Sequence, residues 1–443
     1  MEENPSQNQA VVLQENPDLE RTHAFSSSSR ERVCAFVMYA AAYLYVYSYF
    51  SIDGLFYEWG WKWRILLTVF ALVFVLMTEY LHWTTKRLPE SWIWLGCAAV
   101  VLLSLFVRVH PDQEPVWNEG QTVLFLHIFA VWWAISRTDR LAGGESGSLL
   151  PLDALNGFVL VPFGNFFLRI RCVFSAFRQK PKREGSGRTA AAVLIAALAG
   201  LALLILSARQ LAGADGAFQG LLDRLRFGLN LRIDGDVVGR VLLSLPVGAY
   251  VFGLSAGLGR QDRERVLERG TLAKQTLARL RQVPSAVWLA VLGVFSAMYL
   301  VFFFLQARYL FGAFTRTLPD GFTVAEYARQ GFFELCRVMA INFVLFWLVT
   351  KTGTTDKRTD RTLNIMSILL LAESMIFAVI ALSKLGLYIS CFGFTPKRLE
   401  SSWLACVLLC GCVCALVTHL THRKSFRIWM IIGAATLAVL SLY

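Results

Sequence analysis

The sequence lacks the short motifs that identify most enzyme classes. It has no HExxH metal-binding pattern, no GxSxG nucleophile elbow, no phosphate-binding P-loop and no paired aspartates in its apolar stretches. Its nine cysteines include the cluster CVLLCGCVC, but a zinc site needs thiolates that converge tetrahedrally, which one helix in lipid does not supply. We therefore expect no metal and no cofactor, name no catalytic residue, and favour a protein that is not an enzyme.

Charged residues are also scarce. They make up 17% of the chain, whereas 56% of the residues are hydrophobic and the mean hydropathy is +0.51. A typical soluble domain contains about 25% charged residues. This composition excludes an ordinary soluble protein and indicates one that needs lipid around it.

Long apolar stretches take the place of these charges. A helix that crosses the hydrocarbon core needs about 20 mostly apolar residues. Eleven stretches approach this length, near residues 33–52, 63–83, 91–108, 121–137, 189–209, 237–259, 285–307, 331–350, 363–387, 402–420 and 427–442. Because the last is short, we predict an all-α, polytopic transmembrane helix bundle with about 11 spans, within a range of 10 to 11.

The distribution of Lys and Arg predicts the topology of this bundle. With eleven spans, one set of loops carries about twice as many basic residues as the other, and the positive-inside rule places the richer set in the cytoplasm. The N-terminus is then cytoplasmic and the C-terminus outside. The net charge of +12 therefore indicates topology and contact with anionic lipid headgroups, and no nucleic-acid partner.

The chain divides into four sections. Residues 1–32 are polar and contain no cleavable signal peptide, so we expect a disordered cytoplasmic tail. Residues 33–137 hold four spans and form an anchor block. Residues 138–188 form a cytoplasmic linker whose apolar middle, interrupted by Asn, Gly and Pro, fits an interfacial helix or a re-entrant pair. Residues 189–443 hold seven spans.

A second cytoplasmic stretch, residues 260–284, is basic and amphipathic. We expect it to be interrupted at Gly270 and to contact anionic headgroups or, as an alternative, a protein partner.

Ionisable residues inside the apolar spans are few. Each costs roughly 2.5–3.5 kcal/mol at the bilayer centre on insertion scales, so each requires a partner, a water path or a function. The candidate intramembrane polar cluster consists of Glu334, Arg337, Asn342 and Glu373.

Depth in the membrane predicts how this cluster is paired. Arg337 lies 14 residues before Lys351, and Glu373 lies 12 residues after Arg361. At a rise of about 1.5 Å per residue the two depths agree within about 3 Å, so we predict that Arg337 faces Glu373 and that Glu334 shares the cation. The trio either fixes the register of two helices or lines a working polar cavity, and the sequence leaves both interpretations open.

A second candidate cluster lies at the outer surface and consists of Glu326, Arg329, Lys397 and Arg398. Thr323 and Glu326 have the spacing of a capping box, which predicts that a helix begins here. The three basic residues would suit a phosphate-bearing lipid.

Two segments resemble a known family. The stretch LPDGFTVAEYARQGFFEL is followed, after an interval of about fifty residues, by SKLGLYISCFGFTPKRLESSW. Together they resemble an uncharacterised family of bacterial multi-pass membrane proteins, known only as domains of unknown function (families four-one-seven-three and four-one-five-three). The resemblance covers residues 150–443 well and the first four spans loosely. It implies a location in the bacterial cytoplasmic membrane and no reaction, substrate or catalytic residue.

Three functions are compatible with these patterns. The first is a transport-like or lipid-handling core around the intramembrane cluster. The alternative is a membrane regulatory or scaffold protein that acts through its cytoplasmic basic loops. The third, which we rank lowest, is a membrane-embedded transferase that acts on a phosphate-bearing lipid.

Overall fold

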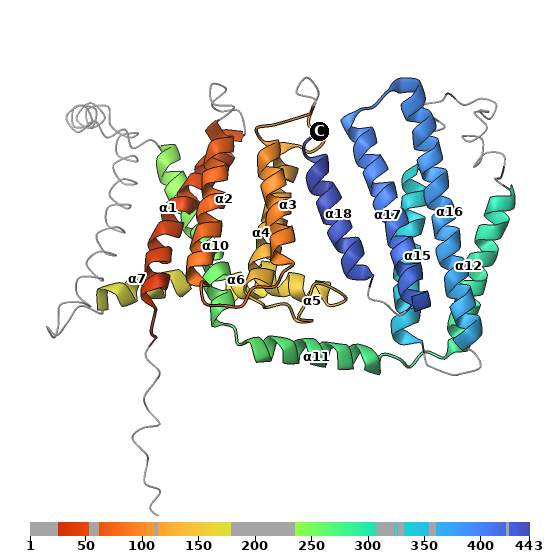
Figure 1. Ribbon diagram of the computed structural model, residues 1–443, viewed down its shortest axis with the longest axis horizontal. Helices are drawn as coiled ribbons and strands as arrows, with labels where there is room; N and C mark the ends of the chain where they lie inside the picture. The colour runs from red at the N-terminus through yellow and green to blue at the C-terminus, as the bar shows by residue number, and fades with distance from the viewer. Residues whose placement is uncertain are drawn as a thin grey trace, which may run out of the picture. The chain divides into compact units, whose positions relative to one another are not determined.

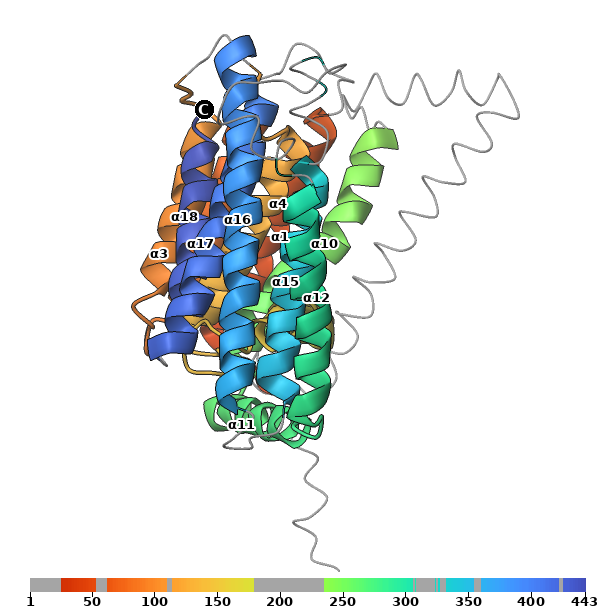
Figure 2. The ribbon, with the colours of Figure 1, turned by 90° about the vertical axis from the view of Figure 1, so that its right-hand side faces the viewer.

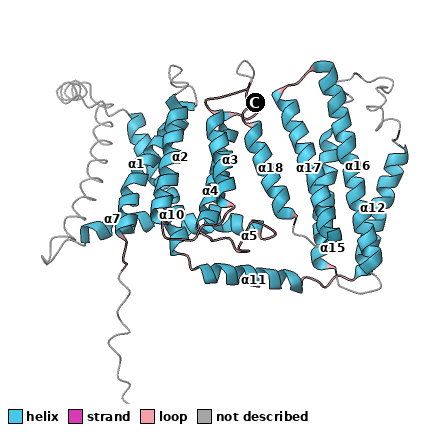
Figure 3. Ribbon diagram, viewed as in Figure 1, coloured by secondary structure: helices cyan, strands magenta, loops and turns pink. Residues whose placement is uncertain are grey.

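The computed structural model describes residues 25–52, 62–109, 114–178, 235–305, 307, 323, 326, 332–353, 360–421 and 425–443. In these ranges the chain forms helices joined by loops and turns, with no strand (Figure 3). Ten of the eleven predicted spans coincide with described helices, and the stretch 189–209 lies outside the described residues.

Six of the described helices are long and apolar enough to cross a membrane, which fits a multi-pass membrane protein. They contain the candidate spans Trp63–Leu81, Gly239–Arg260, Ser285–Leu305, Phe332–Thr352, Arg361–Phe392 and Pro396–Thr421. Two further apolar helices, α3 (Ser91–Ser104) and α18 (Phe426–Leu440), are shorter.

Two other predicted spans also form helices but are not among the six. Helix α1 (Ser29–Ile52) carries five tyrosines, and α4 (Glu119–Arg137) begins with Glu-Gly-Gln and ends with Arg. Such residues lower the mean hydropathy of a segment without preventing a helix.

The chain forms two compact units. The first contains Met1–Val37 and Phe167–Asp234. Its described part consists of the beginning of α1 and helix α7 (Leu168–Arg178). Ser28 and Glu31 form a capping box at the start of α1, with Ser28 N donating to Glu31 Oε2 over 2.8 Å.

The second unit contains Met38–Phe166 and Gly235–Tyr443. Its long helices run side by side (Figures 1 and 2). Helix α3 packs on α4, and α10 (Gly235–Arg260) packs on α2 (Lys62–Leu81). Helix α16 (Asp360–Phe392) is surrounded by α12 (Ser285–Leu305), α15 (Phe332–Thr352) and α17 (Pro396–Thr421). Helix α18 contacts both α3 and α17.

The apolar middle of the linker is helical. Helix α5 (Leu150–Leu155), the π-helical turn η2 (Asn156–Leu160) and helix α6 (Val161–Gly164) follow one another without interruption. A side chain added at Gly157 would collide with Ile135, and one at Gly253 would collide with the carbonyl of Pro162. The small residues that interrupt the apolar pattern therefore allow this segment to pack closely on α4 and α10. It runs across one end of the long helices, as expected for an interfacial segment (Figure 1).

The basic stretch forms helix α11 (Arg263–Arg279), which lies across the same end (Figures 1 and 2). The expected interruption at Gly270 is wrong, because the helix continues through it. A Cβ at Gly270 would lie 1.9 Å from the carbonyl oxygen of Ala142, so glycine is needed where the helix approaches the linker. Val266 packs beside it against Ala142 and Leu149.

The cysteine cluster lies on α17. Cys406, Cys410 and Cys414 have the i, i+4 spacing of one helix face, but this face is not the buried one, because Cys406 is exposed. The buried positions are Gly411 and Cys412. Phe343 and Trp429 both approach the Gly411 Cα closely, so glycine sets the helix spacing here.

Candidate functional site

The two helices expected to carry the intramembrane cluster are neighbours. Helix α15 packs directly against α16, as predicted. Helix α15 contains Glu334, Arg337 and Asn342, and helix α16 contains Glu373, so all four predicted residues lie within long apolar helices.

The predicted pairing of Arg337 with Glu373 is wrong. Arg337 Nη2 lies 3.1 Å from Glu334 Oε1, and the two side chains are 72% and 63% exposed. The buried side of α15 contains Leu335, Met339 and Asn342, which places Arg337 on the opposite side of the helix. The hydrogen bond between Asn342 and Ser374 places Asn342, five residues from Arg337, near the level of Glu373. Both the depth and the rotation of Arg337 therefore differ from the prediction.

Glu373 is buried in the helix group around α16. Only 2% of this residue is exposed. The Ser296 hydroxyl, from α12, donates a hydrogen bond to Glu373 Oε2 over 3.0 Å. Its other oxygen, Oε1, is buried and has no hydrogen-bond partner among the described residues. The carboxyl group therefore uses only part of its hydrogen-bonding capacity.

Asn342 belongs to the cluster, as predicted, through a chain of hydrogen bonds that joins three helices. The Tyr299 hydroxyl donates to Asn342 Oδ1 over 2.7 Å, and Asn342 Nδ2 donates to Ser374 Oγ over 2.8 Å. Ser374 in turn donates to the backbone carbonyl of Leu370. The contribution of α12 was not predicted from the sequence. A Ser and a Tyr three residues apart in an otherwise apolar span are the signal that would have indicated it.

Lys384, on the same helix as Glu373, is also deeply buried. It is 1% exposed and is among the largest fully buried side chains. It follows Glu373 by 11 residues, which is close to three helical turns, so the two residues share one face of α16 about 16 Å apart. Glu373, Asn342, Ser296, Tyr299 and Ser374 are called the buried polar cluster below, and Lys384 lies on the same helix face as Glu373.

The outer-surface cluster stays a prediction, because Arg329 lies outside the described residues. The capping box is confirmed, since the Thr323 N–H donates to Glu326 Oε2 over 3.1 Å and the Glu326 N–H donates to Thr323 Oγ1 over 3.3 Å. Lys397 is exposed. Arg398 Nη1 donates to the carbonyl of Phe392 over 2.8 Å and also to that of Gly393, at the end of α16. Arg398 therefore caps a helix, and its guanidinium is not directed at an outer ligand.

A larger polar region, which the sequence did not predict, lies where the linker meets the ends of α2, α3 and α4. Arg137, at the end of α4, is 4% exposed. Its Nε donates to Glu79 Oε2 over 2.8 Å, and its two terminal nitrogens donate to the carbonyls of His82 and Thr85. Arg87 also pairs with Glu79. Every nitrogen of the Arg137 guanidinium has an acceptor.

A second buried acid in this region is Glu90, before α3. It accepts hydrogen bonds from the backbone N–H and the hydroxyl of Ser146, the latter over 2.8 Å. Arg427, in α18, lies 2.9 Å from Glu90 and 3.0 Å from Glu145. Asp139 pairs with Arg263 at the start of α11. These ion pairs are called the junction network. Their partners are up to several hundred residues apart, so no local pattern reveals them.

His82 lies inside the junction network, just beyond the end of α2. Its Nε2 donates to the carbonyl of Ser255 over 2.8 Å, and only 4% of the residue is exposed. Burial lowers the pKa of His82, an effect that the hydrogen bond to Ser255 opposes and that the cations of Arg137 and Arg140 reinforce. The imidazole is held in its neutral form among fixed charges.

Comparison with known proteins identifies the family and no activity. No curated protein and no solved structure shows a significant match. Residues 95–443 match a family model described as a domain of unknown function, DUF4153, which is one of the two families that the resemblance suggested. Because this match covers well over half of the chain and extends from α3 to the last residue, the protein belongs to the DUF4153 family.

Proposed function

We propose that the chain is a transport-like membrane protein in which Glu373 takes up and releases a proton. The observation that carries the proposal is the state of this carboxyl group, which is 2% exposed with one oxygen bonded to Ser296 and the other without a partner. A buried carboxyl group with unused hydrogen-bonding capacity is not explained by packing alone.

The absence of a cation favours proton exchange over an ion-pair role. Among the described residues, Glu373 forms no salt bridge, since Arg337 is directed away from it. A carboxylate without a cation is costly in an apolar interior, whereas the neutral acid costs much less. A site where the neutral form is stable, and where ionisation needs a change of surroundings, suits a proton-coupled conformational cycle.

The neighbouring hydrogen bonds support such a cycle. Ser296 can both donate and accept, so it serves either form of Glu373. Tyr299, Asn342 and Ser374 link α12, α15 and α16 beside it. Glu373 and Ser374 are neighbours on α16, so a change of charge at Glu373 would act next to the hydrogen bonds that join α12, α15 and α16.

A pH jump on a solid-supported membrane tests the proposal. Reconstituted protein should give a transient current when protons bind, and Glu373→Gln should abolish it. The matched control is Glu334→Gln, which removes an exposed carboxylate already paired with Arg337 and should leave the current unchanged. Equal currents from wild type and Glu373→Gln, with both proteins folded, would refute the proposal.

Labelling with dicyclohexylcarbodiimide gives an independent readout. This apolar reagent adds to protonated carboxyl groups in apolar surroundings and forms an acylurea. Mass spectrometry should find the adduct on Glu373 and not on Glu334, and the yield should fall as the pH rises. An adduct on Glu334 in place of Glu373 would contradict the assignment.

The membrane arrangement belongs to the same proposal. We infer a bacterial cytoplasmic membrane, 10 to 11 spans, a cytoplasmic N-terminus and an outer C-terminus. The linker and α11 lie at one end of the long helices and Tyr443 at the other, which supports this orientation (Figure 1). A reporter fused after Tyr443 that is active only in the cytoplasm should then be inactive, and an active one would reverse the topology.

The regulatory alternative is supported by the exposed surface of α11. Residues 263–281 contain six basic and two acidic side chains, and the buried side of the helix is occupied by the linker. We propose that its basic side contacts anionic lipid or an acidic protein. Replacing Arg265 and Arg269 by Glu should weaken binding to vesicles that contain phosphatidylglycerol, without affecting the pH-jump current. Unchanged binding to these vesicles would show that the basic side of α11 does not contact anionic lipid.

A further inference from the structure

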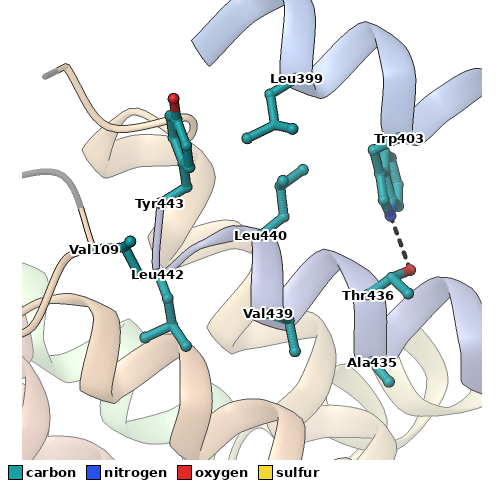
Figure 4. A pocket seen from close by; sticks show the side chains of 9 residues that line it. All are labelled: Val109, Leu399, Trp403, Ala435, Thr436, Val439, Leu440, Leu442 and Tyr443. Carbon is teal, nitrogen blue, oxygen red and sulfur yellow. Dashed lines mark hydrogen bonds between the residues drawn. The ribbon is translucent and has the colours of Figure 1, made fainter. Parts of the chain in front are cut away.

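A pocket of about 530 Å³ lies between the start of α17 and the end of α18 (Figure 4). Leu399 and Trp403 line it from α17, and Ala435, Val439 and Leu440 line it from α18. Val109, beyond α3, closes one side, where its backbone N–H donates to the carbonyl of Leu442 over 2.8 Å. Three segments distant in sequence therefore form one cavity, whose volume is within the usual range for ligand sites.

The walls of this pocket offer almost no polar atoms. Two lining residues carry a hydroxyl group, Tyr443 beyond the end of α18 and Thr436 within it, and the Thr436 hydroxyl is already hydrogen-bonded. It donates to the carbonyl of Ile432 over 2.7 Å and accepts from Trp403 Nε1 over 3.0 Å (Figure 4). A bound water needs two to four polar partners, so water is a poor occupant of such a space.

The pocket lies near one end of its helices and opens toward their surroundings, so an apolar occupant would enter from the lipid. Leu399 lies within one turn of the first residue of α17, and Trp403 lies one turn deeper, against Trp117 at 6.0 Å between ring centroids. Tryptophans gather where hydrocarbon meets headgroups. The rim residues Val109 and Val439 are 67% and 60% exposed, which opens the pocket toward the surroundings of the helices.

We propose that this pocket binds an acyl chain of a membrane phospholipid. Phospholipid tails are the hydrocarbon that surrounds such helices, and an occupant without hydrogen-bonding groups matches walls that are mostly apolar. The bound chain would fill the space between α17 and α18 on the side where α18 also contacts α3. The site is independent of Glu373, and the two proposals succeed or fail separately.

Photolabelling tests the proposal on the full chain in nanodiscs. The probe is a phosphatidylcholine with a diazirine on its acyl chain. After irradiation, we expect adducts on the lining residues Leu399, Trp403 and Leu440 to exceed those on Ile428, an exposed residue of α18 that does not line the pocket. Ala435→Phe fills the pocket and should remove the excess. Ile432→Phe, a similar change at a position that does not line the pocket, should retain it.

A second variant allows the proposal to be tested even if Ala435→Phe does not fold. Val439→Phe changes a rim residue that is largely exposed, so it should fold and still reduce labelling. Native mass spectrometry should show a retained phospholipid in wild type and Ile432→Phe, and its loss in both filled variants. Labelling equal to that of Ile428, labelling unchanged by either filled variant, or crosslinks from the pocket to a second copy of the chain would overturn the proposal.

Discussion

The two polar regions of the second unit bury charge in opposite ways. In the junction network, Arg137 donates to Glu79 and to two backbone carbonyls, and Glu90 accepts from Ser146 and Arg427. In the buried polar cluster, Glu373 has one hydrogen bond and an oxygen without a partner among the described residues.

This difference separates two reasons for keeping a charge inside a protein. A buried ion with all its partners holds segments together, and removing one partner leaves the others unsatisfied. A buried acid without a cation adds little to the fold, so its presence points to a role in function. Substitutions in the junction network should therefore lower the stability of the protein, and substitutions in the buried polar cluster should impair its function.

The largest expected effect is on stability, from Arg137→Ala. The change leaves two carbonyls without their donor and removes one of the two arginines that pair with Glu79. Breaking a buried pair in this way costs about 3–5 kcal/mol. Thermal unfolding in detergent should show a strong decrease in Tm. Arg337→Ala is the matched control, because its exposed pair should contribute less than about 1 kcal/mol. Similar losses from both variants would show that burial does not distinguish the two arginines.

Replacing one acid in each region by its amide sharpens the comparison. Glu90→Gln keeps an acceptor for Ser146 but removes the charge that faces Arg427, and a hydrogen bond to a charged group is worth about 1.5–3 kcal/mol. Glu373→Gln keeps the acceptor for Ser296 and removes no ion pair, so its Tm should stay near that of wild type. If Glu373→Gln proved the more destabilising of the two, the division between structural and functional acids would be wrong.

The sequence predicted the helices well because apolar length is a local property. Ten predicted spans coincide with helices, and the capping box at Thr323 and Glu326 is present. The neighbourhood of α15 and α16 also followed from the short connection between them. These predictions depend on residues close together in the chain.

Side-chain partners depended on information that the local sequence does not contain. The Asn342–Ser374 hydrogen bond places Arg337 about five residues along α15 from the level of Glu373, and the rotation of α15 turns Arg337 outward. Arg427 meets Glu90 only because α18 packs against α3, a contact that no spacing encodes. Arg398 looked like an anion-binding residue, whereas the carbonyls at the end of α16 occupy it.

A smaller, local effect is expected where α11 meets the linker. Gly270→Ala places a methyl group against the Ala142 carbonyl, and such overpacking costs about 1–3 kcal/mol. Hydrogen exchange of residues 263–279 should become faster while the long helices stay protected. Gly293→Ala is the control, because a Cβ there meets nothing within 4 Å and should be neutral or slightly stabilising. Unchanged exchange in Gly270→Ala would mean that α11 does not depend on this contact.

The smallest expected effect is a pH dependence from His82, which contrasts with the proton exchange proposed for Glu373. Because the pKa of His82 is lowered from its ordinary value of 6.5, the unfolded chain binds a proton in a range where the folded chain does not. Stability should therefore fall as the pH decreases below about 6.5, by at most about 1.4 kcal/mol per pH unit from this group. His82→Gln should flatten that part of the Tm profile and leave the pH-jump current intact, since His82 interacts with the junction network and Glu373 does not. A current that disappears in His82→Gln would instead connect the two regions and show that the junction network takes part in proton exchange.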